Sequence, residues 1–251
     1  MAKTGSEIAK GGFANEKEVA AKFNDWKNDK DAQQWLSLMM YNLNEIEYVH
    51  AEKIGQKGYK SDIYVGIRIY IRKKDRRLES VENIQVKLVS GEQGYNQVEK
   101  KKVDAYIKMW HIPQNIVELL KLFDGESEPR KGSRNPKRMF VDEFSTDEQK
   151  QLIDFFQKNL VMIISDVIRG RGRFAAEWTL VINKVNDEYR WKLMSVNEAI
   201  SIYADDCKAG ITKYGSIKLG TITLQRKGGD NGRDTANMLQ FKADPLILFR
   251  K

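Results

Sequence analysis

Two neighbouring segments with a strict alternation of apolar residues constrain this chain more than any other feature. Isoleucine or valine recurs at every second position over most of residues 62–72, and a second alternation runs through residues 81–89 and ends in Ile-Gln-Val-Lys-Leu-Val. A period of two is typical of β-strands with one buried face. We expect the two strands to pair through a hairpin connection at residues 73–80. Gln85 and Lys87 then share the face that the apolar residues leave.

The chain has 251 residues and a single cysteine. This length allows one large domain or two closely packed ones. Cys207 by itself excludes an internal disulfide framework and indicates a reducing cytoplasm. No apolar run approaches the roughly eighteen residues that a membrane helix needs, and the amino terminus has no signal-peptide pattern. We therefore expect a cytoplasmic protein that does not contact a membrane, and its two histidines exclude a histidine-rich metal site.

The net charge of +8 and the pI near 9.3 favour a polyanionic partner. The densest basic segment, residues 128–138, holds five cations and one acid. A solvated loop and a loop that follows phosphates explain this segment equally well. The same two explanations apply to Arg169, Arg171 and Arg173, which alternate with glycine in one turn.

The rest of the chain mixes helical and strand patterns without a repeat or a linker. One helix is expected to begin at Asn15, which would cap it, and further helices are expected at residues 114–123 and 146–159. The all-apolar run at residues 160–164 is typical of a central strand. Residues 178–194 have the pattern of a hairpin.

These elements predict an α/β (α+β) fold, with a mixed central β-sheet flanked by helices. We expect two parts, residues 1–140 and a β-rich part at residues 141–251, which pack as one body.

The residues at the two alternating strands suit phosphodiester hydrolysis. Asp62 opens the first strand, and Gln85 and Lys87 lie on its neighbour. A magnesium ion held by carboxylate and carbonyl oxygens, here Asp62, Gln85 and the backbone carbonyl of Val86, would offset the charge of a phosphate. A nearby lysine can orient or deprotonate the attacking water.

The motif also carries a family resemblance. Ser61-Asp62, followed after twenty-two residues by Gln85-Val86-Lys87, resembles the PD-(D/E)xK nuclease pattern. Seven segments in order are similar to the HinP-type restriction endonucleases, small type II enzymes that cut GCGC and are related to the CCGG-cutting MspI type. These segments are GGFANEKEVA, GYKSDI, NIQVKLVS, GYNQVEK, KRMF, IRGRGRFAAEW and QRKGGDNGRDTANMLQFK.

The resemblance implies a restriction-endonuclease-like catalytic core in residues 1–140 and a β-rich DNA-recognition lobe in residues 141–251. It further implies Mg²⁺-dependent cleavage of double-stranded DNA at GCGC, after the first G, which leaves 5′ overhangs. A monomer or weak dimer is expected, with a cognate DNA methyltransferase in the same bacterial system.

The chain departs from the superfamily pattern at two positions. Ser61 replaces the usual proline, and Gln85 replaces the second acid. An amide oxygen can ligate magnesium but brings no charge, so the metal affinity should be lower than with two carboxylates. Glu16 is a candidate for the missing carboxylate. The alternative is that Glu16 is a helix-start glutamate favoured by the helix dipole.

Two segments are candidates for reading the bases. Tyr95, Asn96, Gln97 and Lys100 follow the catalytic strand closely. Amides can pair with base edges, lysine with guanine acceptors, and an exposed aromatic ring can enter a base step. The alternative for these residues is a capped helix start with solvated side chains.

The second segment lies near the carboxyl terminus. Gln225, Arg226 and Lys227 lead from a strand into a glycine-rich turn, and Arg233 and Asn237 precede the returning strand. The resemblance implies that Gln225 and Lys227 contact bases. An ordinary Asn-Gly hairpin turn explains part of the same pattern.

The leading hypothesis is therefore a type II restriction endonuclease specific for GCGC. A repair or structure-specific endonuclease with the same core is the second; it would depend less on base-edge amides. The third is a DNA-binding module whose catalytic core has decayed, a possibility that Gln85 raises.

Overall fold

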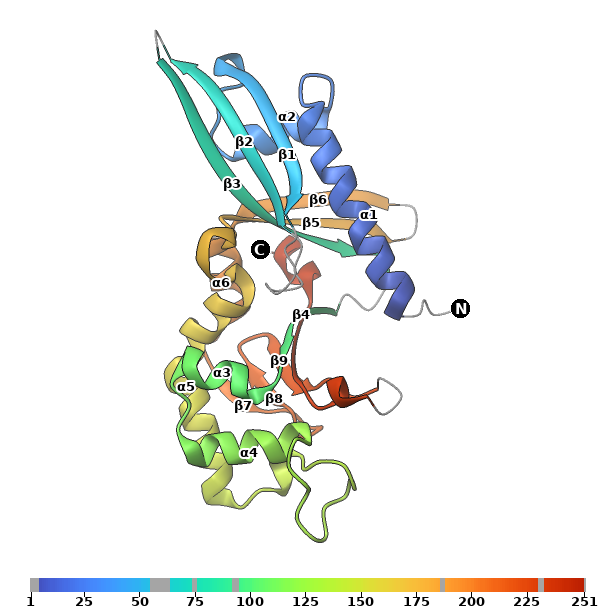
Figure 1. Ribbon diagram of the computed structural model, residues 1–251, viewed down its shortest axis with the longest axis vertical. Coiled ribbons are helices and arrows are strands. Elements are labelled where there is room, and N and C mark those ends of the chain that lie inside the picture. Colours follow the sequence, from blue (N-terminus) through green and yellow to red (C-terminus); the bar gives the residue numbers. More distant parts are fainter. Residues whose placement is uncertain are drawn as a thin grey trace. The chain divides into compact units, whose positions relative to one another are not determined.

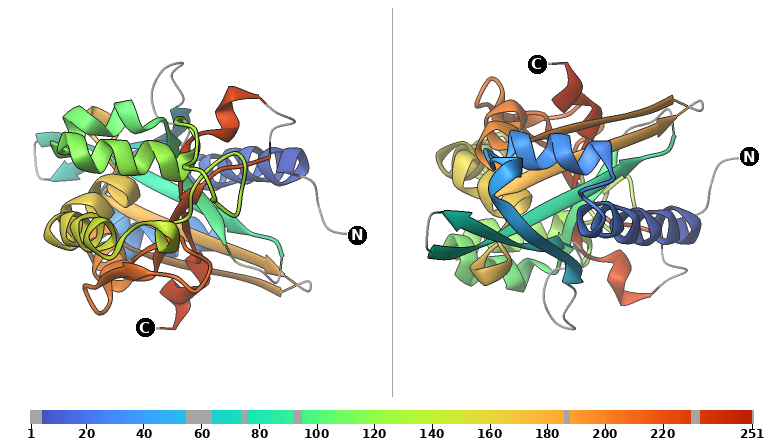
Figure 2. Two further views of the ribbon diagram at one scale, coloured as in Figure 1. Left: turned by 90° about the horizontal axis from the view of Figure 1, so that it is seen from below. Right: turned by 90° about the horizontal axis from the view of Figure 1, so that it is seen from above.

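The computed structural model describes residues 5–54, 64–73, 76–91, 95–185, 188–229 and 233–250 (Figures 1 and 2), with the side chains of 5–13, 54, 64–67, 72–73 and 76–77 left aside. The chain divides into two compact units. Unit 1 comprises Met1–Gly94, Arg169–Ala199 and Pro245–Lys251, and unit 2 comprises Tyr95–Ile168 and Ile200–Asp244. The boundary expected near residue 140 falls inside unit 2, because the chain passes between the units several times.

Unit 1 contains a five-stranded mixed sheet in the order β1-β2-β3-β5-β6. All neighbours are antiparallel except β3 and β5, which are parallel. The two alternating segments pair as predicted, from Tyr64 opposite Gln85 to Lys73 opposite Arg76. The hairpin connection predicted at residues 73–80 is wrong, because Lys73 belongs to β2 and residues 76–80 belong to β3 and pair with β2. The strands are β1 (Ile46–Ile54), β2 (Tyr64–Lys73), β3 (Arg76–Val89), β5 (Trp178–Val185) and β6 (Glu188–Ser195).

Helices α1 (Gly5–Asn24) and α2 (Lys30–Leu38) pack on one face of this sheet, as Figure 2 (right) shows. Phe23 of α1 and Trp35 of α2 are fully buried, with ring centroids 5.2 Å apart. Ile84 and Val86 of β3 belong to the same apolar cluster. Since successive side chains of a strand point to opposite faces, Gln85 and Lys87 lie on the face away from α1 and α2. Short 3-10 segments complete the unit: η1 (Leu43–Glu45), η3 (Gly172–Phe174) and η6 (Pro245–Phe249).

Unit 2 contains an antiparallel sheet in the order β4-β10-β9-β8-β7. Its strands are β4 (Asn96–Lys101), β7 (Ala209–Ile211), β8 (Ile217–Leu219), β9 (Ile222–Arg226) and β10 (Leu239–Ala243). The other elements are α3 (Val103–Trp110), α4 (Gln114–Asp124), η2 (Val141–Glu143), α5 (Thr146–Arg169), α6 (Val196–Ala204) and η5 (Asp234–Ala236). Helix α5 ends at the unit boundary and α6 crosses it.

The central strand predicted at residues 160–164 is wrong, because this run belongs to helix α5. Leu160, Ile163 and Ile164 are buried, whereas the two residues between them are 56% and 39% exposed. Burial at positions three and four apart is the period of an amphipathic helix. An all-apolar run hides this period, since its exposed positions are also apolar.

The helix start predicted at Asn15 is also wrong, and so is the helix start given as the alternative for residues 95–100. The segment after Gly94 forms strand β4 before α3 begins at Val103. Helix α1 begins at Gly5, so Asn15 lies inside it, only 3% exposed. Among the helices that the structure describes, none is long and apolar enough to cross a membrane.

Candidate active site and DNA-contacting face

Gln85 and Lys87 lie on the middle strand of the unit 1 sheet. Gln85 is opposite Tyr64 on β2 and Thr179 on β5, and its side chain is almost completely buried, at 2% exposure. Lys87, on the same face, is half-buried. Asp62 precedes Tyr64 by two residues and lies outside the described residues. The structure therefore brings the amide and the amine together, and their convergence with Asp62 stays a prediction.

The neighbouring Val86 packs its side chain into the cluster beneath α1 and α2, with 6% exposure. Its backbone carbonyl stays a predicted metal ligand. Within the described ranges, no three His, Cys, Asp or Glu side chains gather as a metal site. A buried glutamine oxygen on an interior strand is nevertheless a donor that magnesium accepts, so the set predicted here fits that ion.

Glu16 does not have the helix-start position that would explain it as a dipole effect. It lies well inside α1, is 8% exposed, and places Oε2 3.3 Å from Lys53 Nζ. Helix α1 covers the sheet face opposite to that of Gln85 and Lys87. The helix-start alternative is therefore wrong, and a catalytic role for Glu16 stays a prediction.

The arginine-glycine turn is fixed to strand β3, which carries Gln85 and Lys87. The side-chain amide of Asn83, two residues before Gln85, donates to the carbonyl oxygens of Arg173 at 3.2 Å and Ala175 at 3.3 Å. The backbone N–H of Asn83 donates to Glu177 Oε2 at 2.7 Å. Side chains Arg171 and Arg173 are exposed. The turn thus has a structural anchor in its backbone while its cations face solvent.

The basic segment at residues 128–138 is tied to acidic partners within unit 2. Arg130 forms two hydrogen bonds with Glu148, at 2.9 and 2.5 Å, and these lower the pKa of Glu148 to about 2. Arg134 forms two with Asp142, at 3.0 and 2.6 Å. Internal ion pairs therefore engage two of the five cations, which favours a structural loop over a phosphate-tracking one.

The predicted base-reading residues lie on the sheet of unit 2, which has one apolar and one polar face. Leu239 and Phe241 of β10 are fully buried, and the Phe241 ring meets the rings of Tyr106 and Trp110 of α3, each at 5.9 Å. Gln240, between them, projects on the other face. Its neighbours there are Lys100 on β4 and Gln225 on β9.

A β-bulge brings Gln97 to this polar face as well. Gln97 and Lys100 are three residues apart, so a regular strand would place them on opposite faces. The pairing steps from Phe241 opposite Glu99 to Lys242 opposite Gln97, which leaves Val98 as an extra residue. Such a bulge shifts the alternation by one position. The candidates Gln97, Lys100 and Gln225 therefore share one face, which is the polar face of this sheet.

Asn96 and Tyr95 differ in their surroundings. Asn96 is opposite the buried Ala243, and so projects on the side away from Gln97. Tyr95, just before the strand, is 60% exposed. An exposed aromatic ring at this position suits the predicted contact with a base step.

Arg226 and Asn237 have structural partners. Arg226 Nη2 donates to Asn237 Oδ1 at 2.6 Å, and Asn237 Nδ2 donates to the Gly125 carbonyl at 2.7 Å. Gly125 has a φ of +86°, and a Cβ there would lie 2.4 Å from the Lys137 carbonyl. These contacts join the β9–β10 connection to the loop that follows α4. Arg226 and Asn237 thus stabilise a turn. Arg233 is exposed and Lys227 half-buried, and their contacts with DNA stay predictions.

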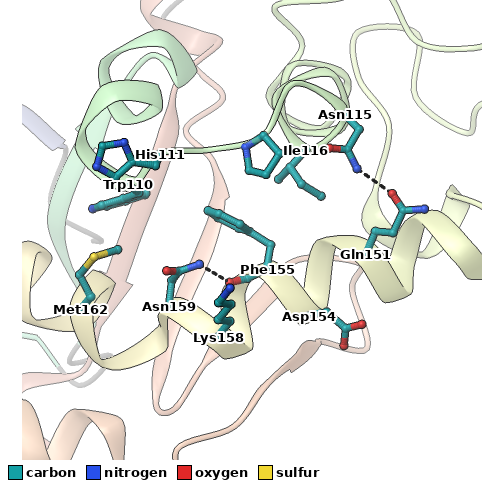
Figure 3. A pocket seen from close by; sticks show the side chains of 11 residues that line it. Trp110, His111, Asn115, Ile116, Gln151, Asp154, Phe155, Lys158, Asn159 and Met162 are labelled. Carbon is teal, nitrogen blue, oxygen red and sulfur yellow. Dashed lines mark hydrogen bonds between the residues drawn. The ribbon is translucent and has the colours of Figure 1, made fainter.

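A cavity of about 540 Å³ lies beside that junction, lined by charges of both signs that include Arg226, Arg233, Glu126 and Asp234. Asp124, at the end of α4, is fully buried, and burial raises its pKa to about 8. A second cavity of about 540 Å³ lies between the α3–α4 connection and α5 (Figure 3). Its rings and aliphatic side chains, with a single lysine and a single aspartate, do not suit a polyanion.

The fold and the strand geometry can now be compared with known proteins. A family described as R.HinP1I restriction endonuclease matches residues 39–249. The chain belongs to the R.HinP1I restriction endonuclease family. It is therefore a site-specific deoxyribonuclease, and the predicted family and enzyme class are confirmed.

A solved structure extends this comparison. The restriction endonuclease MspI, in complex with its cognate DNA, matches with a TM-score of 0.66 and 14% sequence identity over 95% of this chain and 91% of that chain. At this identity the match speaks for the fold, and it confirms the predicted restriction-endonuclease-like class. No curated protein matches the chain. As a restriction endonuclease, the protein binds double-stranded DNA, and enzymes of this class generally use a divalent metal.

Proposed function

We propose that this R.HinP1I-family protein is a Mg²⁺-dependent type II restriction endonuclease that cleaves duplex DNA at GCGC, after the first G, and leaves 5′ overhangs. One observation carries the proposal. Gln85 and Lys87 share a face of the middle strand, and Gln85 pairs with a residue only two positions after Asp62.

In the proposed mechanism, Asp62, Gln85 and the Val86 carbonyl supply the oxygens that hold Mg²⁺. The bound ion would supply positive charge beside the scissile phosphate and lower the pKa of its water. Lys87 orients the attacking water and, in its neutral amine form, accepts its proton. The middle strand is hydrogen-bonded on both sides, so it holds the amide and the amine at a fixed spacing. Glu16 is a further candidate carboxylate, in competition with its ion pair to Lys53.

Recognition is assigned to the polar face of the unit 2 sheet. A GCGC site presents guanine acceptors and cytosine amino donors in its major groove. Lys100 and Lys227 can donate to guanine, while the amides of Gln97 and Gln225 each offer one donor group and one acceptor. Arg171 is assigned to phosphate, which contributes affinity without sequence information.

The proposal extends to the cellular setting. A nuclease that cuts GCGC requires protection of the host genome, which a cognate DNA methyltransferase would supply. We place both in the bacterial cytoplasm, consistent with a single cysteine, and assign the nuclease as a monomer or weak dimer.

The test is digestion of a plasmid of known sequence with the full-length protein and Mg²⁺, followed by sequencing of the ends. The expected result is a set of ends that all map after the first G of GCGC, with none formed in EDTA. Uniform cutting of DNA without GCGC would support a structure-specific or repair nuclease. Specific binding without cleavage would support a decayed module.

A further inference from the structure

Three glutamines on three adjacent strands form a connected row across the polar face of unit 2. Gln240 on β10 donates from Nε2 to Gln97 Oε1 on β4 at 2.7 Å. Gln225 on β9 donates from Nε2 to Gln240 Oε1 at 3.5 Å, a longer and weaker contact. Gln97 is exposed and Gln225 half-buried, but Gln240 is only 7% exposed. The middle glutamine therefore faces its two neighbours more than solvent.

We propose that Gln240 is a positioning residue that fixes the amide orientation of Gln97 and Gln225, and so determines which hydrogen-bonding group each presents to a DNA base. This inference rests on the proposed function, in which Gln97 and Gln225 read bases. It assigns no base contact to Gln240 itself.

A primary amide carries an acceptor oxygen on one side and an amino group with two N–H donors on the other. The oxygen of Gln97 accepts from Gln240, so its amino group is directed away from the row. The amino group of Gln225 is directed at Gln240, so its carbonyl oxygen is the group directed away from the row. One glutamine thus presents a donor suited to guanine and the other an acceptor suited to the cytosine amino group.

The row also couples the two base-reading amides. Gln240 offers its nitrogen on one side and its oxygen on the other. If its amide turned over, both neighbours would have to turn as well to keep their hydrogen bonds. Gln97 and Gln225 therefore present opposite groups in either arrangement, and they exchange them only together.

The backbone around Gln240 gives it a fixed position for this role. Strand β10 is paired on both sides, and the flanking Leu239 and Phe241 are fully buried. Because the backbone is held on both sides, we expect a change of the Gln240 side chain to affect Gln97 and Gln225 through its two hydrogen bonds and to leave the strand in place.

Two substitutions separate positioning from structure. Gln240→Met keeps the length of the side chain but removes both hydrogen bonds, so both neighbouring amides rotate freely. Gln240→Glu offers only acceptors, so Gln97 must turn its amino group inward and lose its outward donor. Thr223→Glu is the control for charge, since it adds one negative charge on the same face, on β9 opposite Lys242, and leaves all three glutamines in place.

The experiment measures dissociation constants of the full chain in Ca²⁺ for GCGC duplexes, for duplexes with one base pair changed, and for random DNA, along with melting temperatures. Gln240→Met should lose roughly tenfold in discrimination between GCGC and changed sites, while its affinity for random DNA and its melting temperature stay close to wild type. Thr223→Glu should weaken binding to every duplex by the same factor. If Gln240→Met fails to fold, the Gln240→Glu protein is compared with Thr223→Glu instead.

Wild-type discrimination that survives in both Gln240 variants would overturn the inference while leaving the proposed function intact. If the wild type prefers a site other than GCGC, the proposed specificity fails, and the same ratios are measured on the preferred site. If the wild type discriminates no sequence, both fail.

Discussion

Replacing Lys87 by methionine should remove cleavage while leaving DNA binding and the fold nearly unchanged. Methionine keeps the apolar stem of a half-buried side chain and removes only its amine. A positioned general base contributes roughly 10²–10⁴ in rate. This range corresponds to about 3–5 kcal/mol in the activation barrier. The stability change should stay below about 1 kcal/mol, because Lys87 is only half-buried.

Lys192→Met provides a matched control. Lys87 and Lys192 both lie opposite Val181, from the two strands that flank β5, and both are half-buried. Both variants therefore remove one positive charge from the same row of the same sheet face. Single-turnover cleavage of a GCGC duplex in Mg²⁺ should be lost in Lys87→Met and kept within about threefold in Lys192→Met. Equal losses in the two variants, or Mg²⁺-dependent cleavage by Lys87→Met, would refute the role given to Lys87.

Three further predictions follow from other parts of the molecule. Arg171→Ala should weaken binding to all sequences alike and reduce the slope of log K against log salt by about one. Gln225→Ala should instead lose about 1–3 kcal/mol of discrimination between cognate and random DNA. Titrations of both duplexes at several salt concentrations separate the two effects, and equal loss of affinity on both duplexes in both variants would contradict the assignment. Gly125→Ala should lower the free energy of unfolding by about 3 kcal/mol, and Gly228→Ala by about 1 kcal/mol, as measured by urea unfolding. Both glycines have a positive φ, but of the two only Gly125 lacks space for a Cβ. Equal losses of stability would contradict the steric explanation. Burial raises the pKa of Asp124 from 3.8 to about 8. Between these pH values the folded state holds a proton that the unfolded state releases, so the free energy of unfolding should fall as the pH rises. Asp124→Asn should reduce this dependence of stability on pH, and an unchanged dependence would show that another group causes it.

The sequence was sufficient to predict the local parts of the catalytic strands. Alternation predicts that Gln85 and Lys87 share a face and that the two strands pair, since both properties depend on residues close in the chain. The parallel pairing of β3 with β5 joins residues more than ninety positions apart. No local pattern contains such a contact, so the middle position of β3 in the sheet had to come from the structure.

The polar face of the unit 2 sheet, proposed to contact DNA, shows a second limit of prediction from sequence. Gln97 and Lys100 share a face only because Val98 is an extra residue in the pairing with β10. A bulge depends on the partner strand, and the sequence of β4 does not reveal it. Gln240 was missed for the same reason, because its importance comes from neighbours on two other strands. A run of polar residues at alternating positions on β9 and β10 is the signal that would have indicated this face.

The most direct test of the account is a crystal structure of the full chain with a GCGC duplex and Mn²⁺, in which anomalous scattering locates the metal. We expect a metal peak at coordination distance, about 2.1 Å as for Mg²⁺, from the Asp62 carboxylate and the Gln85 side-chain oxygen, with the Lys87 amine directed at the attacking water. A metal peak away from Asp62 and Gln85, or an Asp62 side chain that points away from Lys87, would contradict it.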